Sequence, residues 1–411
     1  MPSAASNPTY KLLPSLWSKD KIYEALLEAS PTLGIIPKDT NMVETKRYVP
    51  VGYGSPQGLG TSYGGAKFAK SASTAIEWEI QHKHYYGLFS IDGFLWRQSE
   101  YGKRTAVLID PMTRDSSNLM EQAKRDISRA IFGNGGGAIG QASSVSTNRI
   151  VFGSARDIRG IENNMLLEAS TADGTSGSVK AGYVTVSQVG DEENPFVDVS
   201  EATVATGIPT VAGTDYFFRR DTFGAMISGF KSWLPAWSTG SLPGTFKGVN
   251  RNVNAPRLAG RYVDVRTLSP RAALLRACVR SADGNGKPSH YICSTSRWEA
   301  LANELSAAGA LTMTKAPAAD IGGFKTGVEY EAIKFTGPKG PVTVIADPEC
   351  GDADSWLIQA DTWVLGSLGD LLHWEFKGRQ EDGADAKECM LVGDMEMYCR
   401  NPYPNVRLRH A

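Results

Sequence analysis

The run 108–141 constrains the fold more than any other stretch, because it predicts one long helix with a glycine-rich end. Asp110 before Pro111 indicates a start, since a carboxylate caps free N–H groups and proline suits the first helical position. Apolar side chains recur at helical spacing over 119–131. Gly133 then stops the helix. A helix over 111–132 would be about 33 Å long, which suggests a strut.

Composition bounds the class of protein. A chain of 411 residues suggests two or three structural units, at roughly 150 residues each. The net charge of -1 indicates neither a nucleic-acid-binding tail nor an acidic disordered chain. The five scattered cysteines form no C-x-x-C pair, which predicts reduced thiols without a disulfide framework. We find no secretory signal at the start, and no apolar run of about 18 residues that could span a membrane.

The segment before the long helix predicts two extended parts. Residues 1–43 read as a loose arm with one short helix over 18–28, interrupted by prolines. Residues 44–104 read as a long β-hairpin. Its strands are expected over 44–53 and 75–91, and its tip between them is rich in glycine and serine. An isolated two-stranded ribbon is marginal in water, so both parts are expected to need a partner surface.

The rest of the chain predicts a mixture of strands and helices. The acidic stretch 162–201 is expected to be a solvated, β-rich insertion, and 203–218 is strand-like. Residues 268–370 alternate helices with strands, which favours a compact α/β unit. The predicted elements there and beyond are helices over 269–281 and 295–307, a strand over 290–294, a hairpin over 322–345, and strands over 355–366, 371–378 and within 388–410.

Several motifs match functional patterns by letter only. Gly135-x-Gly137-x-x-Gly140 follows a helix end, whereas a dinucleotide site needs a helix start, so we expect a turn there. His82 and His84 would share one strand face and could begin a metal site, but no third ligand is close in sequence, so we expect surface or interface histidines. The stretch 52–55 lacks the spacing of a nucleophile elbow. The basic and aromatic run 78–97 could stack on bases, although its alternation fits a hairpin better.

The order of parts carries a resemblance over nearly the whole chain. An arm, a ribbon, a long helix, an α/β unit and a returning strand region follow one another. The phrases that carry it are MEQAKRDISRAIFGNGGGAIGQ, TVATGIPTVAGTDYFFRRD with ISGFKSWLPAW, FKGVNRNVNAPRLAGR, HYICSTSRWEALANEL, and GFKTGVEYEAIKF with VTVIADPEC. In this order the chain resembles the major capsid proteins of tailed bacteriophages, which have the Hong Kong 97-type fold of α+β class.

The resemblance implies a role for each part. It implies an N-terminal arm at 1–43, an extended loop at 44–104 that lies over a neighbouring subunit, a peripheral domain at 105–204 with a spine helix at 111–132 and the insertion at 162–201, an axial domain at 205–370, and a return to the peripheral domain at 371–411. Inter-subunit contacts are then expected from Trp78, Tyr85 and Phe89 on the ribbon, Lys67 and Lys70 at its tip, and Arg125 and Arg129 on the spine.

The implied function is self-assembly into hexamers and pentamers of an icosahedral head around double-stranded DNA. The implied partners are other copies of the chain, a separate scaffold protein, a portal protein and possible decoration proteins, without cofactor, metal or membrane. The implied location is the virion, with assembly in the bacterial cytoplasm. Some similar proteins join subunits through a Lys–Asn bond, for which Lys67 or Lys70 and Asn401 or Asn405 have suitable chemistry.

Two other functions stay open from the sequence. One is the shell of an encapsulin-like cellular compartment, which has the same fold and would need a cargo-binding groove. The other is a soluble α/β enzyme that uses residues 268–370, which would need a convergent polar cluster there. The sequence shows no constellation that has to be catalytic.

Overall fold

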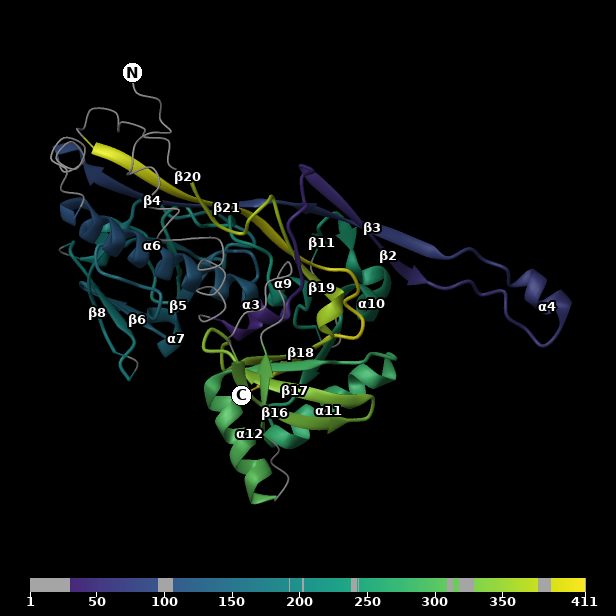
Figure 1. Ribbon diagram of the computed structural model, residues 1–411. Coiled ribbons are helices and arrows are strands. Elements are labelled where there is room, and N and C mark those ends of the chain that lie inside the picture. Colours follow the sequence, from purple (N-terminus) through teal and green to yellow (C-terminus); the bar gives the residue numbers. More distant parts are fainter. Residues whose placement is uncertain are drawn as a thin grey trace. The chain divides into compact units, whose positions relative to one another are not determined.

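The computed structural model describes residues 30–94, 106–191, 193–201, 203–237, 242, 244–308, 313–317, 329–375 and 386–410. The predicted helix at 18–28 lies outside these residues. The chain divides into two compact units (Figure 1). Unit 1 holds the described parts of Met1–Leu33, Lys83–Gly229 and Ser367–Met395, and unit 2 those of Gly34–His82, Phe230–Gly366 and Glu396–Ala411. The division by function into arm, loop, peripheral and axial domains stays a prediction.

The long helix of unit 1 is α6, Ala106–Phe132. It begins five residues earlier than the predicted start at Pro111, which lies inside the helix. A proline there removes one backbone hydrogen bond, a loss that a helix of 27 residues tolerates. The C-terminal end is at Phe132 as predicted, and the apolar stripe is buried at Ala123 and Ile127.

The glycine-rich segment after α6 is a tightly packed turn. Gly135 and Gly137 have positive φ angles of 84° and 80°, which favour glycine. A Cβ atom on Gly137 would collide with the carbonyl oxygen of Thr222, and one on Gly136 with that of Asp173. Gly136 and Gly137 therefore let backbone segments approach each other closely. This confirms a stop and a turn at the helix end.

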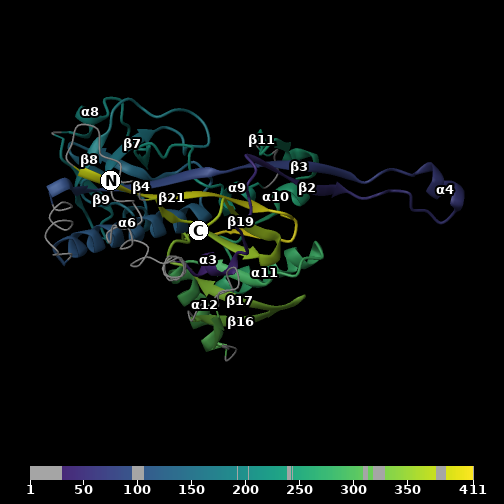
Figure 2. The same cartoon turned by 45° about the horizontal axis from the view of Figure 1, so that its top comes forward.

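The strands after this turn close into a barrel in the order β10-β5-β6-β9-β8-β7. The strands are β5 (Ala138–Ser146), β6 (Arg149–Phe152), β7 (Leu166–Ser170), β8 (Val184–Val189), β9 (Phe196–Val199) and β10 (Tyr216–Arg219), with short helices α7 (Ala155–Ile158) and α8 (Val204–Gly207). Figure 2 labels β7, β8, β9 and α8 of this region. The acidic stretch 162–201 is β-rich as predicted, but it supplies three of the six barrel strands and is no separate insertion. The prediction of one strand over 203–218 is wrong before residue 216, because α8 opens that stretch.

The predicted return strand 75–91 is two strands with different partners. β3 (Thr74–Gln81) pairs with β2 (Lys46–Gly54) in unit 2, and β4 (Lys83–Asp92) pairs with β21 (Ala386–Cys399). β21 also pairs with β20 (His373–Glu375) and is the neighbour of β19 (Trp363–Ser367) in the same five-stranded sheet. Smaller elements are α3 (Pro31–Ile35), β1 (Lys38–Asp39), α4 (Tyr63–Phe68), α9 (Phe230–Trp233), β11 (Thr245–Phe246), β12 (Val249–Asn250), η3 (Arg251–Asn254), α10 (Ala255–Ala259), η4 (Ala360–Thr362) and β19 (Trp363–Ser367).

Unit 2 contains a seven-stranded sheet in the order β13-β22-β18-β14-β17-β16-β15. Its strands are β13 (Arg261–Asp264), β14 (His290–Cys293), β15 (Met313–Pro317), β16 (Glu329–Gly337), β17 (Gly340–Ala346), β18 (Asp354–Ile358) and β22 (Val406–Arg409). Helices α11 (Pro270–Asp283) and α12 (Thr295–Ala307) pack against each other and on this sheet. The α/β prediction is confirmed for this region, with Ser269 capping α11.

The C-terminal strand belongs to unit 2, whereas the long helix α6 belongs to unit 1. The return of residues 371–411 to a peripheral domain stays a prediction. β22 lies between β13 and β18, in the sheet of unit 2. Its alternation places Val406 and Leu408 in the hydrophobic core of that sheet, which fixes the strand there. None of the described helices is long and apolar enough to cross a membrane.

The cysteines yield a first prediction. All five are free and buried, and burial raises the pKa of four of them (Cys278, Cys293, Cys389 and Cys399) to about 12. Because the thiolate is the reactive form, the native protein should not react with Ellman's reagent at pH 8, and all five thiols should react after denaturation in guanidinium. Fast labelling of two or more thiols in the native protein would contradict this packing.

Candidate assembly surface

The base of the β2–β3 ribbon is fixed by buried aromatic side chains of unit 2. Trp78 is fully buried, and its ring lies edge-on to Trp233 and Phe246, with centroids 5.2 and 5.9 Å away. Val49 and Ile80 are buried beside it on the same ribbon. Trp78 therefore has no surface left for a neighbouring subunit. Its expected role as an inter-subunit contact does not fit this position.

The tip of the ribbon presents apolar side chains to solvent. Leu59, Tyr63 and Phe68 are 85%, 83% and 95% exposed, and the short helix α4 at the end of the ribbon has no buried residue (Figure 1). The helix is capped at its N-terminus by the Ser62 hydroxyl, which accepts a hydrogen bond from the Gly65 N–H at 3.1 Å. A helix this short is marginal in water without packing. The tip therefore has the properties of a surface that another protein covers.

The two expected lysines lie at this tip. Lys67 is in α4 and Lys70 follows it, and both are exposed. Among their expected partners, Asn401 is exposed but Asn405 is fully buried. The Asn405 side-chain oxygen accepts hydrogen bonds from the Gln359 N–H at 2.8 Å and the Trp363 indole N–H at 3.0 Å. A lysine cannot reach Asn405, so Asn401 alone keeps the chemistry for a cross-link.

The predicted contacts Tyr85 and Phe89 lie on β4 and face inwards. The Tyr85 hydroxyl donates to the Asp126 carboxylate at 2.9 Å, and Phe89 lies edge-on to Trp374 at 5.8 Å. The opposite face of β4 carries Tyr86 and Leu88, which are 57% and 55% exposed. Side chains alternate between the two faces of a strand, so the exposed pair Tyr86 and Leu88 lies on the face opposite to the predicted contacts Tyr85 and Phe89.

The predicted arginines of the long helix have partners in unit 1. Arg125 pairs with Glu162 at 3.4 Å, and an Arg129 guanidinium N–H donates to the Arg156 carbonyl at 2.8 Å. Both interactions connect α6 to the segment between the barrel strands β6 and β7. The charge pairing expected at this helix therefore exists within one chain for Arg125, whereas Arg129 donates to a backbone carbonyl.

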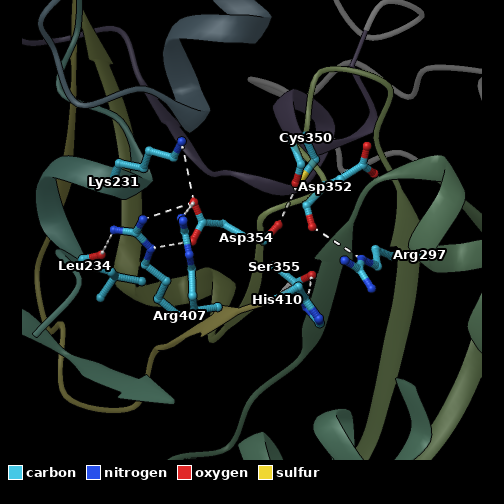
Figure 3. A network of polar contacts seen from close by, with 11 residues as sticks. Lys231, Leu234, Arg297, Cys350, Asp352, Asp354, Ser355, Arg407 and His410 are labelled. Atoms are coloured by element: carbon cyan, nitrogen blue, oxygen red, sulfur yellow. Dashed lines mark hydrogen bonds and ion pairs between the residues drawn. The ribbon is translucent and has the colours of Figure 1, made fainter. Parts of the chain in front are cut away.

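A buried ionic cluster connects α9 with strands β18 and β22 in unit 2 (Figure 3). Arg407 donates to both oxygens of the Asp354 carboxylate at 2.9 and 3.0 Å, and the Lys231 ammonium lies 3.5 Å from it. Arg407 also donates to the Leu234 carbonyl at 3.3 Å. Burial raises the pKa of Asp354, but the Arg407 hydrogen bonds and the surrounding positive charges outweigh it, so the net pKa is below the ordinary value.

The pair in this region that most resembles a catalytic site is a packing contact. The Ser355 hydroxyl and His410 Nε2 are 2.8 Å apart, like a nucleophile and its base (Figure 3). Ser355 is fully buried, however, and burial lowers the pKa of His410 to about 4, which makes it a weak base. The cavity beside His410 measures about 20 Å³, room for about one water molecule. The pair holds the last strand in the sheet.

The histidine pair of the sequence does not build a metal site in the part of the chain that the structure describes. His84 Nδ1 contacts the Asp394 carboxylate at 2.5 Å, and its ring stacks on Tyr86 at 6.2 Å. No group of three or more His, Cys, Asp or Glu side chains among the described residues could hold a metal ion.

This chain resembles known proteins in its structure and not in its sequence. No protein-family model and no curated protein matches the sequence. Among solved structures, the capsid of cyanophage A-1(L) is similar over 92% of this chain and 92% of that chain, with a TM-score of 0.51 and 12% identity. The chain has the fold of a phage capsid subunit. This confirms the resemblance to Hong Kong 97-type capsid proteins at the level of the fold.

Two further similar structures have lower scores. The capsid of an empty GTA particle is 9% identical, with a TM-score of 0.43 over 94% of this chain and 90% of that chain. The encapsulin complex from Synechococcus elongatus is 8% identical, with a TM-score of 0.41 over 91% of this chain and 83% of that chain.

The ionic cluster yields a stability prediction. Asp354→Asn should lower the free energy of unfolding by about 3–5 kcal/mol, because it leaves the buried Arg407 charge without its partner. Urea denaturation of the unassembled subunit measures the change. Asp264→Asn is the matched control, since the Asp264–Arg266 pair is exposed, and it should leave the midpoint unchanged. Equal midpoints for both variants would contradict a stabilising cluster.

The buried histidines yield a pH prediction. Burial lowers the pKa of His290 and of His410 to about 4, below the ordinary 6.5. The unfolded chain therefore binds protons that the folded chain does not bind between pH 6.5 and 4. Unfolding free energy should fall across this window, by about 3 kcal/mol for each of the two histidines.

Urea midpoints at pH 7, 5.5 and 4.5 measure this slope. The double variant His290→Asn/His410→Asn should lose most of it. Asp354 adds its own loss below pH 3.8, because its folded pKa is depressed. A urea midpoint that stays constant from pH 7 to 4.5 would contradict the lowered pKa values of His290 and His410.

Proposed function

We propose that this protein is the major capsid protein of a tailed bacteriophage, which assembles into hexamers and pentamers of an icosahedral head around double-stranded DNA. The observation that carries the proposal is the ribbon tip, in a chain whose fold matches a phage capsid subunit along 92% of both chains. Three large apolar side chains are almost fully exposed at the tip. A fold built for shells would cover them with a second copy of the chain.

The energetics favour many modest contacts over one strong contact. A typical stable interface buries about 1,600 Å², and a narrow ribbon tip supplies only part of such an area. Each copy would use its tip once as a ligand and its body once as a receptor. Contacts that act together in a closed shell add through multivalency, so the shell is stable although each contact is weak.

The other parts of the chain take roles in the same proposal. Helix α6 would be the spine of the peripheral domain, and the sheet of unit 2 with α11 and α12 would be the axial domain around which hexamers and pentamers gather. A separate scaffold protein would guide assembly, a portal protein would occupy one vertex, and decoration proteins could bind outside. The shell would hold DNA by confinement, since the net charge is only -1. Its role is structural and its location the virion, after assembly in the host cytoplasm.

An encapsulin-like shell is the alternative function with the same fold. Electron microscopy of the purified protein, expressed with and without its neighbouring genes, separates the two. Shells that need a scaffold gene and package DNA support the capsid. Shells that form from the chain alone and enclose a neighbouring enzyme support the compartment. A stable monomer that turns over a small molecule would overturn both.

The tip yields the assembly prediction. The double variant Leu59→Ser/Phe68→Ser should fold normally, because neither side chain is packed, but should form no closed shells. Analytical ultracentrifugation and electron microscopy measure assembly, and urea denaturation verifies the fold. Val253→Ser removes a hydrophobic side chain of η3 that is 56% exposed and does not belong to the ribbon tip, and serves as the matched control. Normal shells from the tip variant would refute the role of the tip.

A further inference from the structure

A cavity of about 420 Å³ lies in unit 2, lined by residues of β13, helix α11 and the segment before β22. This volume is within the range of small-molecule sites, about 300–1,000 Å³. The side chains that matter are three arginines and three aromatic rings: Arg261, Arg276, Arg280, Trp237, Tyr262 and Tyr403. All six belong to one compact unit, so the cavity does not depend on the arrangement of the two units.

The cavity carries positive charge that the described chain leaves unneutralised. Arg276 and Arg280 lie one turn apart on α11, are exposed, and pair with no carboxylate among the described residues. Arg261 lies over the ring of Tyr403 at 4.8 Å. The carboxylate in the lining, Asp264, already accepts hydrogen bonds from Arg266. Positive charges that line one cavity repel each other, and an anionic ligand would relieve this repulsion.

Two buried donors in the lining also lack an acceptor. Arg261 Nε and Trp237 Nε1 are buried and have no hydrogen-bond partner in the part of the chain that the structure describes. Nearly all buried polar groups in proteins are hydrogen-bonded. Both groups can only donate, so the partner they lack is an acceptor. Charge and hydrogen bonding independently indicate an anion with several oxygen atoms.

We propose that this cavity binds the phosphate group of a nucleotide, with the base against the aromatic rings. One guanidinium group can donate hydrogen bonds to two oxygens of a phosphate, and one phosphate can accept from more than one arginine. A carboxylate would occupy one arginine and leave the others unneutralised. Trp237 and Tyr262 are half-buried in the lining, and aromatic faces stack on any base. The nucleotide can be free or part of a single strand.

The test uses the full-length unassembled subunit. Isothermal titration calorimetry measures binding of inorganic phosphate and adenosine monophosphate, and fluorescence anisotropy measures a labelled short oligothymidine. The variant Arg276→Gln/Arg280→Gln should raise the Kd for the nucleotide at least about tenfold and should fold normally, because both side chains are exposed. Arg271→Gln is the matched control, an exposed arginine on the same helix outside the cavity lining, and should change the Kd less than twofold.

Each outcome decides the proposal. Tighter binding of the mononucleotide than of phosphate, lost in the double variant, supports it with a free nucleotide as ligand. Tighter binding of the oligonucleotide, with the mononucleotide as competitor, supports it with a single strand as ligand. Absence of binding, equal loss in Arg271→Gln, unchanged affinity in the double variant, or a preference for a poly-glutamate peptide overturns it. The proposal is independent of shell assembly, so its failure leaves the capsid function standing.

Discussion

The burial of Trp78 against Trp233 and Phe246 is the contact on which the ribbon depends. The three rings come from β3, α9 and β11, and a buried aromatic side chain removes about 150–250 Å² from water. The Trp233 indole N–H donates to the Met397 carbonyl at 3.0 Å, which connects the cluster to β21. Arg251 stacks on Phe246 at 4.3 Å, and burial lowers its pKa to about 10. One end of the ribbon is thereby anchored, and the other carries the exposed tip.

Local signals in the sequence were sufficient for α11 and α12, whereas α4, α9, η3 and α10 of the same unit were not predicted as helices. Ser269 and Pro270 mark the start of α11, and Ser294 caps α12. The β16–β17 turn follows from Gly337 and Gly340. In each case the information lies within a few residues of the element. The predicted start of α6 was wrong because it also rested on a local signal. Pro111 favours a helix start, but the helix begins at Ala106 and continues through it.

Long-range pairing was beyond a reading of local patterns. The barrel closes through β5 and β10, whose partners Gln141 and Tyr216 are far apart in the chain. The acidic stretch looked like an insertion because its charges are visible in the sequence and its pairing is not. The division of 75–91 into β3 and β4 also depends on β21, which comes almost at the end of the chain. The tendency of a segment to form a strand is visible in its own residues, whereas the strand with which it pairs is not.

The candidate contacts show the same limit. Tyr85 and Phe89 were predicted as contacts of the ribbon, but the sequence cannot say which face of β4 is inward when both faces carry aromatic residues. Trp78 was recognised as apolar, and only its position against Trp233 shows that it is buried. The tip did carry a usable signal. Leu59, Tyr63 and Phe68 are large apolar residues in a run of glycine and serine that cannot bury them.

The weakness of helix α4 has a consequence for how a shell would reach its final form. A short helix that no packing holds would lose conformational entropy when a neighbour covers it, which would lower the affinity of each contact. A low affinity means fast dissociation, so a wrongly placed subunit would leave before its neighbours bind around it. A weakly held tip would thus give a growing lattice a means of correcting errors. A rigid, tightly binding tip would trap them.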